Sequence, residues 1–232
     1  MTGSAGRLDL RLAGGARVRF TTRADGDLGL TEPGQPAEVL ANRADVLDRY
    51  GLDALAAGRQ VHGARVALVT TAGPGYVVAG DPADGQATRL RRVAVAVHVA
   101  DCLPIALAGA GGVAIVHGGW RGLAGGVIAA GVDALRRLGV TGPIEAAIGP
   151  AAGGCCYETG PDVRDAFGGR DAPGQAGCVD LKEVARRKLA SVGVDRVHDV
   201  GICTLCAEPG LVFSRRRDGP AAGRQAGIAW LD

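Results

Sequence analysis

The chain has 232 residues, 47% of them hydrophobic but only 3% aromatic, with 39 glycines. This length fits one compact α+β domain with a core of small side chains. The net charge of +2, with both signs interspersed, excludes a broad basic face for nucleic acid and a polybasic membrane tail. We expect neither a signal peptide nor a membrane span, and therefore a cytoplasmic protein whose six cysteines are thiols, ligands or core residues.

The first quarter of the chain shows strand, loop and helix patterns in turn. Apolar and polar residues roughly alternate over 8–20, as in a strand, and the polar, Gly- and Pro-rich stretch 21–36 is typical of a loop. Apolar residues share one face over 37–50, which predicts a helix ended by the following glycine. His62 is expected in a short extended stretch that leads into a strand at 66–69.

Two buried strands are predicted in the middle of the chain. Valine alternates with alanine and histidine over 93–99, and the next residues include Pro104, which we expect to stop regular ladder pairing. A second apolar run, 113–116, ends in the motif HGGWRG at 117–122. A single helix closed by Gly139 should follow that motif.

The last third mixes short strands and helices. We predict a strand around 144–148, a short helix near 161–167 and a helix over 180–192 capped by its first residue, an aspartate. The tail, 197–231, is expected to form strands around Gly- and Arg-rich turns. Because strands and helices do not alternate strictly, an α+β fold with mixed sheets is favoured over a doubly wound fold.

Three residues near strand ends could bind a metal ion. Cys102 and His117 each follow a predicted buried strand, and His62 precedes a third. A thiolate and two imidazoles suit zinc, and three protein ligands leave the fourth tetrahedral position open, as in catalytic sites. The alternative is a buried cysteine with two core histidines. We interpret His98 and His198 as structural.

Arginines and glycines suggest anion sites. Arg121 lies where HGGWRG passes from a strand into a helix, so exposed amides and a guanidinium could meet an anion; a tight turn with a solvated arginine is the alternative. The same two interpretations apply to the arginines of FSRRRDGPAAGR at 213–224. Cys203 and Cys206 form a C-x-x-C pair, but without a second pair nearby in the sequence we do not expect a zinc or redox site there.

The ordered motifs resemble those of the YfiH family, also called the laccase-domain, polyphenol-oxidase-like or peptidoglycan editing factor family. The resemblance covers about three quarters of the chain. The matching segments are QVHG at 60–63, ADCLP at 100–104, HGGWRG at 117–122, IGP at 148–150, CCYE at 155–158, CT at 203–204 and FSRRRDGPAAGR at 213–224.

The resemblance implies a single α+β domain over 1–232 with mixed sheets and flanking helices. It also implies a zinc site whose ligands are His62, Cys102 and His117. The implied activity is purine-nucleoside chemistry, namely phosphorolysis of adenosine, inosine and methylthioadenosine and hydrolytic deamination of adenosine. The partners would be purine nucleosides and phosphate, without nucleic acid or membrane.

Roles for individual residues follow from that chemistry. Phosphorolysis needs an anion beside an oxocarbenium-like ribose, and Arg121 is the first choice to hold it, before Arg216 and Arg224, with Arg23 as a further candidate. Cys102 is expected to be catalytic as a ligand, and Asp101 beside it as a proton shuttle or a group that orients the ligands.

The sequence departs from the family pattern near the N-terminus. The stretch 24–38 is short and lacks the glycine-rich, serine-containing loop that family members usually carry. The chain could therefore be a catalytically weakened metal-binding paralogue, and a cytoplasmic peptidoglycan-precursor editing hydrolase is another alternative. A copper phenol oxidase is less attractive, because one cysteine and two histidines suit a mononuclear site.

Overall fold

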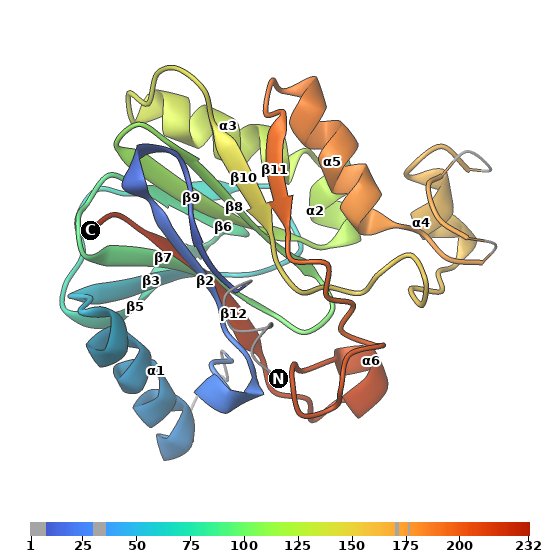
Figure 1. Ribbon diagram of the computed structural model, residues 1–232, viewed down its shortest axis with the longest axis horizontal. Coiled ribbons are helices and arrows are strands. Elements are labelled where there is room, and N and C mark those ends of the chain that lie inside the picture. Colours follow the sequence, from blue (N-terminus) through green and yellow to red (C-terminus); the bar gives the residue numbers. More distant parts are fainter. Residues whose placement is uncertain (1–7, 30–35, 170–171, 176) are drawn as a thin grey trace.

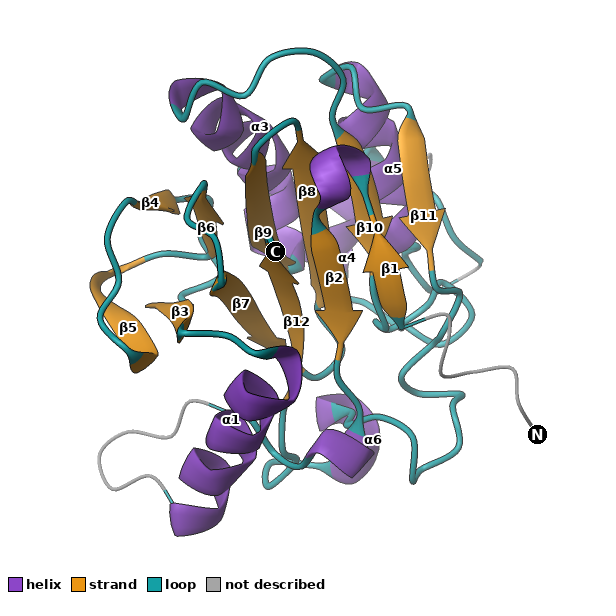
Figure 2. Ribbon diagram, turned by 60° about the vertical axis from the view of Figure 1, so that its left-hand side comes forward, coloured by secondary structure: helices purple, strands orange, loops and turns teal. Residues whose placement is uncertain are grey.

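Two mixed β-sheets packed face to face form the centre of the molecule (Figure 1). The computed structural model describes residues 8–29, 36–169, 172–175 and 177–232. Helix α1 covers the outer face of the first sheet, and α3 and α5 cover the outer face of the second (Figures 1 and 2). The layers therefore run helix, sheet, sheet, helix, which confirms the predicted α+β class with mixed sheets and flanking helices.

Each sheet has six strands. In order, the first sheet consists of β1 (Asp9–Arg11), β2 (Arg17–Phe20), β12 (Gln225–Trp230), β7 (Val93–Val99), β3 (Ala54–Arg59) and β5 (Gly75–Pro82). The second consists of β11 (Arg196–Asp199), β10 (Glu145–Ile148), β8 (Leu103–Gly109), β9 (Gly112–Gly118), β6 (Gly85–Thr88) and β4 (Val66–Val69). Parallel pairs are β7–β3, β3–β5, β10–β11 and β4–β6, and the other neighbours are antiparallel.

Six α-helices are present among the described residues, and most of them are short. They are α1 (Ala37–Tyr50), α2 (Trp120–Ala124), α3 (Val127–Arg137), α4 (Pro161–Asp165), α5 (Leu181–Ser191) and α6 (Arg215–Asp218), with 3-10 turns at Ala13–Gly15 and Arg23–Asp25. No helix among the described residues has the length and apolar character that a membrane crossing needs.

The alternation of valine and alanine in β7 reflects its two packing partners. Val95, Val97 and Val99 belong to the cluster between the sheets, whereas Ala94 and Ala96 belong to the cluster beneath α1. All residues of β7 are buried, since the strand is covered on both faces. Small alanines let a helix approach closely, while the valines fill the space between the sheets.

Several predicted elements are confirmed at close to their predicted bounds. Helix α1 ends at the left-handed Gly51, as expected. Helix α5 begins after Asp180, whose side chain accepts hydrogen bonds from the amides of Lys182 and Glu183. The strand predicted over 93–99 is β7. These elements depend on local signals, a cap and a periodic pattern, which the sequence displays directly.

Other elements differ from the prediction. The single strand expected over 8–20 is a hairpin of β1 and β2 joined by a 3-10 turn. The helix expected after HGGWRG is broken into α2 and α3 at Gly125 and Gly126. Pro104 does not end pairing but lies within β8, opposite His117. Its carbonyl still accepts a 3.0 Å hydrogen bond from the amide of Gly149, so the proline costs the sheet only one donor.

The connections between the two sheets determine where the candidate site lies. The chain passes from the first sheet to the second between β3 and β4, between β5 and β6, and between β7 and β8. These three crossovers carry His62, Asp84 and Cys102 respectively. His117 lies in β9, opposite the start of β8. Residues far apart in the sequence therefore meet at one edge of the sandwich.

Candidate metal centre

His62, Cys102 and His117 converge on one point. Their ligand atoms all lie within 4.8 Å of one another, and Cys102 Sγ is 3.9 Å from His62 Nε2. The two imidazole rings meet edge to face with centroids 4.8 Å apart. His117 is buried, Cys102 is half-buried and His62 is exposed, so the cluster is closed on the protein side and open on the other. This is the arrangement of a three-ligand site with one free position.

Asp84 supports the cluster from behind. Its buried Oδ1 accepts hydrogen bonds from His117 Nδ1 and from the amide of His62, both at 2.8 Å. The other carboxylate oxygen accepts from the amides of Val61 and Gly63 at 3.0 and 2.8 Å. With Nδ1 of His117 engaged, Nε2 is the nitrogen left to bind an ion, and such carboxylate–histidine pairs orient metal ligands. Asp84 was not predicted from the sequence, because no motif surrounds it and only the connections between the sheets bring it to this position.

Charge interactions favour a thiolate in the metal-free cluster. Burial alone would raise the pKa of Cys102, but the neighbouring His117 and His62 lower that pKa to about 6. Burial alone would lower the pKa of His117, but Cys102 and the Asp84 carboxylate raise it to about 9. Burial would also raise the pKa of Asp84, yet hydrogen bonds from His117, Val61 and Gly63 lower it. The thiolate is the form of cysteine that binds metals.

Gly119 provides the room in which the three ligands meet. A Cβ atom at this position would lie 2.9 Å from His62 Cδ2, 3.5 Å from Cys102 Sγ and 3.6 Å from His117 Cε1. The first distance is shorter than carbon atoms tolerate, so a side chain here would push His62 away. Gly119 of HGGWRG therefore permits close packing of the three side chains, in addition to any role of the exposed amides.

The backbone is unusual at two of the candidate residues. His62 and Asp101 have φ values of 59° and 96°, and only Arg92 shares a positive φ among the described non-glycine residues. Asp101 is held in place by Thr204 Oγ1, which donates to Oδ1 at 2.6 Å, and by the amide of Arg216, which donates to Oδ2 at 2.8 Å. Such conformations cost free energy and persist where surrounding contacts hold them, often at functional sites.

A cavity of about 780 Å³ opens in front of the cluster. His62, Cys102 and His117 line it together with Asp101 and Tyr157. Its wall also carries four arginines, Arg59, Arg215, Arg216 and Arg224. A cavity of this size accommodates a small organic molecule, and the guanidinium groups favour an anionic ligand.

The cavity separates the predicted anion-binding arginines into two groups. Arg216 and Arg224 line it, whereas the lining residues of the described chain do not include Arg121 or Arg23. The guanidinium of Arg121 lies 4.2 Å from the ring centroid of Trp120. That of Arg23 bonds the Asp218 carboxylate and packs over Phe213. Spacing alone could not reveal this division, because it depends on which side of each loop faces the cluster.

The two histidines interpreted as structural lie in different surroundings. His98 is 6% exposed and forms part of the cavity wall, with its amide donating to Gln60 Oε1 at 2.8 Å. Burial, with the charges of Arg43, His117 and Arg224, lowers the pKa of His98 to about 3. His98 is therefore neutral near pH 7. His198 is exposed on β11, away from the cluster.

Fold and site together define a class: α+β proteins of two packed mixed sheets with a candidate mononuclear metal site at the base of a cavity. The model of the family described as "Multi-copper polyphenol oxidoreductase laccase" matches residues 11–232. A purine nucleoside phosphorylase of Xylella fastidiosa is 37% identical over 84% of this chain and 80% of its own length. Purine nucleoside phosphorylase ORF3 of Streptomyces griseus is 38% identical over 95% and 96%.

A solved structure agrees with these sequence matches. The Bacillus licheniformis protein YfiH superposes with a TM-score of 0.81 at 29% identity, covering 94% of this chain and 93% of that one. The chain therefore belongs to the YfiH family of laccase-like proteins, as its motifs predicted. The phosphorylase names of its relatives support an enzyme that acts on purine nucleosides and phosphate, and the His/Cys/His cluster suggests a metal site.

Proposed function

We propose that this protein is a zinc-dependent purine nucleoside phosphorylase whose ion is bound by His62, Cys102 and His117. The observation that carries the proposal is the position of this cluster at the base of a cavity lined by four arginines. One thiolate and two imidazoles, one of them oriented by Asp84, are a donor set that suits zinc. The four histidines of the chain are too few for the many histidine ligands of a multicopper oxidase.

Phosphorolysis transfers the ribosyl group of a nucleoside to phosphate and releases the purine. When bound, zinc would act as a Lewis acid beside the reacting group. The chain's own contribution is to hold phosphate against the ribose, and Arg216 and Arg224 are better placed for this than Arg121 or Arg23, since they line the cavity. Positioning two reactants in this way removes much of the entropic barrier to their reaction.

Asp101 fits the role of an orienting group better than that of a proton shuttle. Both of its carboxylate oxygens already accept hydrogen bonds, from Thr204 and from the amide of Arg216. Asp101 thereby links the segment that carries Cys102 to the segment that carries the cavity arginines. Its contribution to catalysis would be the placement of Arg216 relative to the metal centre.

Hydrolytic deamination of adenosine is a second reaction of the same site. It requires an activated water and a group that donates a proton to the departing ammonia. The observation in its favour is that His62 is exposed and that all three residues of the cluster line the cavity, where a bound ion would supply an activated water. An effect of the short 24–38 loop on substrate preference stays a prediction, because residues 30–35 of this loop lie outside the described residues.

One assay tests the proposal. The purified protein is incubated with adenosine, inosine or methylthioadenosine, with and without phosphate, and the products are separated by chromatography. Phosphorolysis predicts phosphate-dependent release of adenine or hypoxanthine, and deamination predicts inosine from adenosine without phosphate. Both should vanish in Cys102→Ala and persist in Cys178→Ser, whose thiol lies outside the candidate metal cluster.

Two outcomes would contradict the proposal. Bound zinc without turnover of any nucleoside would favour the peptidoglycan-precursor editing hydrolase or a binding module. If the protein purified without chelator holds no metal, the proposed metal binding by His62, Cys102 and His117 is wrong.

A further inference from the structure

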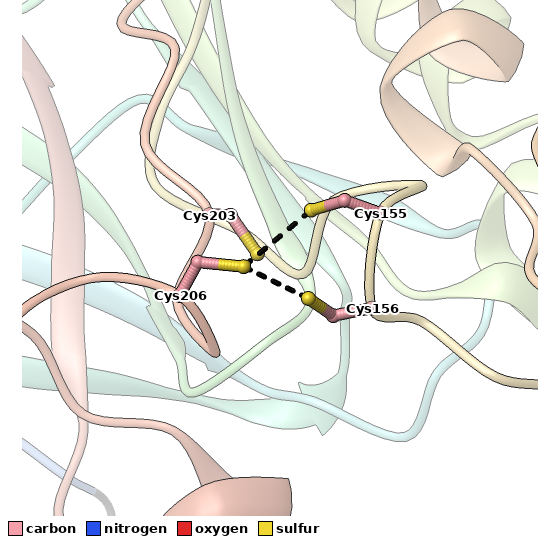
Figure 3. Close-up of side chains that lie close together, drawn as sticks. All are labelled: Cys155, Cys156, Cys203 and Cys206. Carbon is pink, nitrogen blue, oxygen red and sulfur yellow. Dashed lines mark hydrogen bonds between the residues drawn. The ribbon is translucent and has the colours of Figure 1, made fainter.

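Four cysteine side chains outside the cavity gather at one point (Figure 3). Cys155 and Cys156 lie in the turn after β10, and Cys203 and Cys206 lie in the turn after β11. Their four sulfurs all lie within 4.8 Å of one another. No metal site was predicted at Cys203 and Cys206, because no second cysteine pair lies close to them in the sequence. Parallel pairing of β10 and β11 supplies that pair from about 50 residues away.

We propose that Cys155, Cys156, Cys203 and Cys206 form a second, structural zinc site. Four thiolates without a free position are the ligand set of structural zinc, in contrast to the open three-ligand cluster. In a tetrahedral site with Zn–S bonds of about 2.3 Å, neighbouring sulfurs are about 3.8 Å apart. The separation of Cys155 and Cys206 is 3.6 Å and that of Cys156 and Cys206 is 2.8 Å, so small rotations of the side chains would produce this geometry.

The surrounding backbone is arranged for sulfur ligands. The amide of Gly153 points at Cys203 Sγ and donates to it at 3.3 Å. A Cβ at Gly153 would lie 3.2 Å from Cys155 Sγ and 3.4 Å from Cys203 Sγ, so the glycine preserves the space of the cluster. The amide of Ala207 donates to Cys203 O at 2.9 Å, which closes the C-x-x-C turn. The hydrogen bond from the Gly153 amide to Cys203 Sγ stabilises the thiolate form of Cys203 relative to the thiol.

Two side chains from other elements hold the loop that carries Cys203 and Cys206. Arg217 donates to the carbonyl of Thr204 at 2.6 Å, and Lys182 donates to the carbonyl of Ile202 at 3.1 Å. Both residues therefore hold the backbone on either side of Cys203. They come from two separate elements, α6 and α5, and each is also paired with a carboxylate, Arg217 with Asp218 and Lys182 with Asp199.

Two other uses of the cysteines fit the geometry less well. A disulfide joins two sulfurs and gives no reason for two further thiols to lie in contact with it, whereas a single ion explains all four. A cluster of several irons holds its cysteine sulfurs farther apart than one ion does. A lone tetrahedral ion with four sulfur ligands is the arrangement that remains, and zinc is the ion that suits it without redox chemistry.

The proposed ion would fix one wall of the cavity. Tyr157, directly after Cys156, lines the cavity, and the guanidinium of Arg216 packs over its ring at 5.0 Å. Thr204, directly after Cys203, donates to Asp101. Among the described residues, the Ala151–Cys203 bridge is the β-pairing between these two loops beyond β10 and β11. The second zinc would therefore fix the positions of Tyr157 and Asp101 relative to each other.

The test is metal analysis of the full chain, purified under reducing conditions without chelator. We expect two zinc ions per wild-type chain and one in the double variant Cys155→Ser/Cys206→Ser, with Cys178→Ser as the matched control that keeps both. X-ray absorption of a variant with His62→Ala and Cys102→Ala should show a zinc ion with sulfur ligands only. This measurement does not depend on enzymatic activity, so its result is separate from that of the nucleoside assay.

Two results would overturn the proposal. One is a wild-type chain whose zinc content is not lowered by Cys155→Ser/Cys206→Ser. The other is a Cys156–Cys206 disulfide, found by alkylation and mass spectrometry in the protein kept under reducing conditions. If the double variant fails to fold, the sulfur-only spectrum in the His62→Ala and Cys102→Ala background still decides the question, because all four cysteines remain there.

Discussion

The two clusters of candidate metal ligands differ in what surrounds them. The His62, Cys102 and His117 cluster has three ligands, a carboxylate behind it and a cavity in front. The four-cysteine cluster has four sulfur atoms and the Gly153 amide behind it, and its cysteines are not among the residues that line that cavity. Ligand number and surroundings therefore indicate different roles: the open cluster suits chemistry, and the closed one suits holding two loops together.

The largest expected effect comes from removing the carboxylate behind the open cluster. In Asp84→Asn, His117 loses its anionic partner and three backbone amides lose an acceptor of full charge. Loss of such a partner lowers metal affinity by roughly 10–100-fold. Competition with a zinc chelator measures this, and the sulfur-only zinc of the second cluster should be unaffected. Equal loss from both clusters would mean that Asp84 acts on the fold as a whole.

Gly119→Ala tests whether metal binding requires the close packing of His62, Cys102 and His117 around Gly119. The added Cβ would lie 2.9 Å from His62 Cδ2, which forces His62 to move. We expect zinc at this cluster to bind several-fold more weakly, measured by the same chelator competition. The matched control is Gly210→Ala, where a Cβ meets nothing within 4 Å. An unchanged affinity in Gly119→Ala would show that His62 is not a necessary ligand.

Arginine variants test whether phosphate is bound by the arginines that line the cavity or by Arg121, which does not line it. Arg216→Ala and Arg224→Ala should raise the KM for phosphate by roughly 10-fold, about 1.4 kcal/mol for one lost charge-assisted contact. Arg121→Ala should change it little, since Arg121 does not line the cavity. Steady-state kinetics at varied phosphate measure this. The reverse order of effects would restore Arg121 as the phosphate ligand.

The last prediction concerns acid stability near the cavity. Because the pKa of His98 is lowered to about 3, the unfolded chain, with an ordinary histidine pKa, binds a proton below about pH 6.5 that the folded chain does not. Stability therefore falls as the pH falls, by about 2 kcal/mol for this group between pH 7 and 5. His98→Gln should remove that part of the loss, measured as urea unfolding at both pH values. Equal pH dependence in the two proteins would contradict the neutral, buried state of His98.

Sequence patterns predicted the helices and strands better than the contacts between residues far apart in the chain. The caps and periodicity of α1, β7 and α5 are local properties, so their bounds could be predicted. The candidate ligands His62, Cys102 and His117 were predicted through family motifs, since their spacing alone is a weak signal. Asp84 and the pairing of the two cysteine pairs depend on which strands are neighbours in a sheet. No local pattern encodes that, because strand order is a property of the whole chain.

The three crossovers between the sheets also have a consequence for folding. His62, Asp84 and Cys102 reach one another only after strands of both sheets have paired, which requires contacts between distant parts of the chain. The open cluster therefore does not exist as a binding site in the unfolded chain or in an isolated hairpin. A metal ion bound there would stabilise the finished sandwich by slowing its unfolding, while leaving the rate at which the sandwich forms largely unchanged.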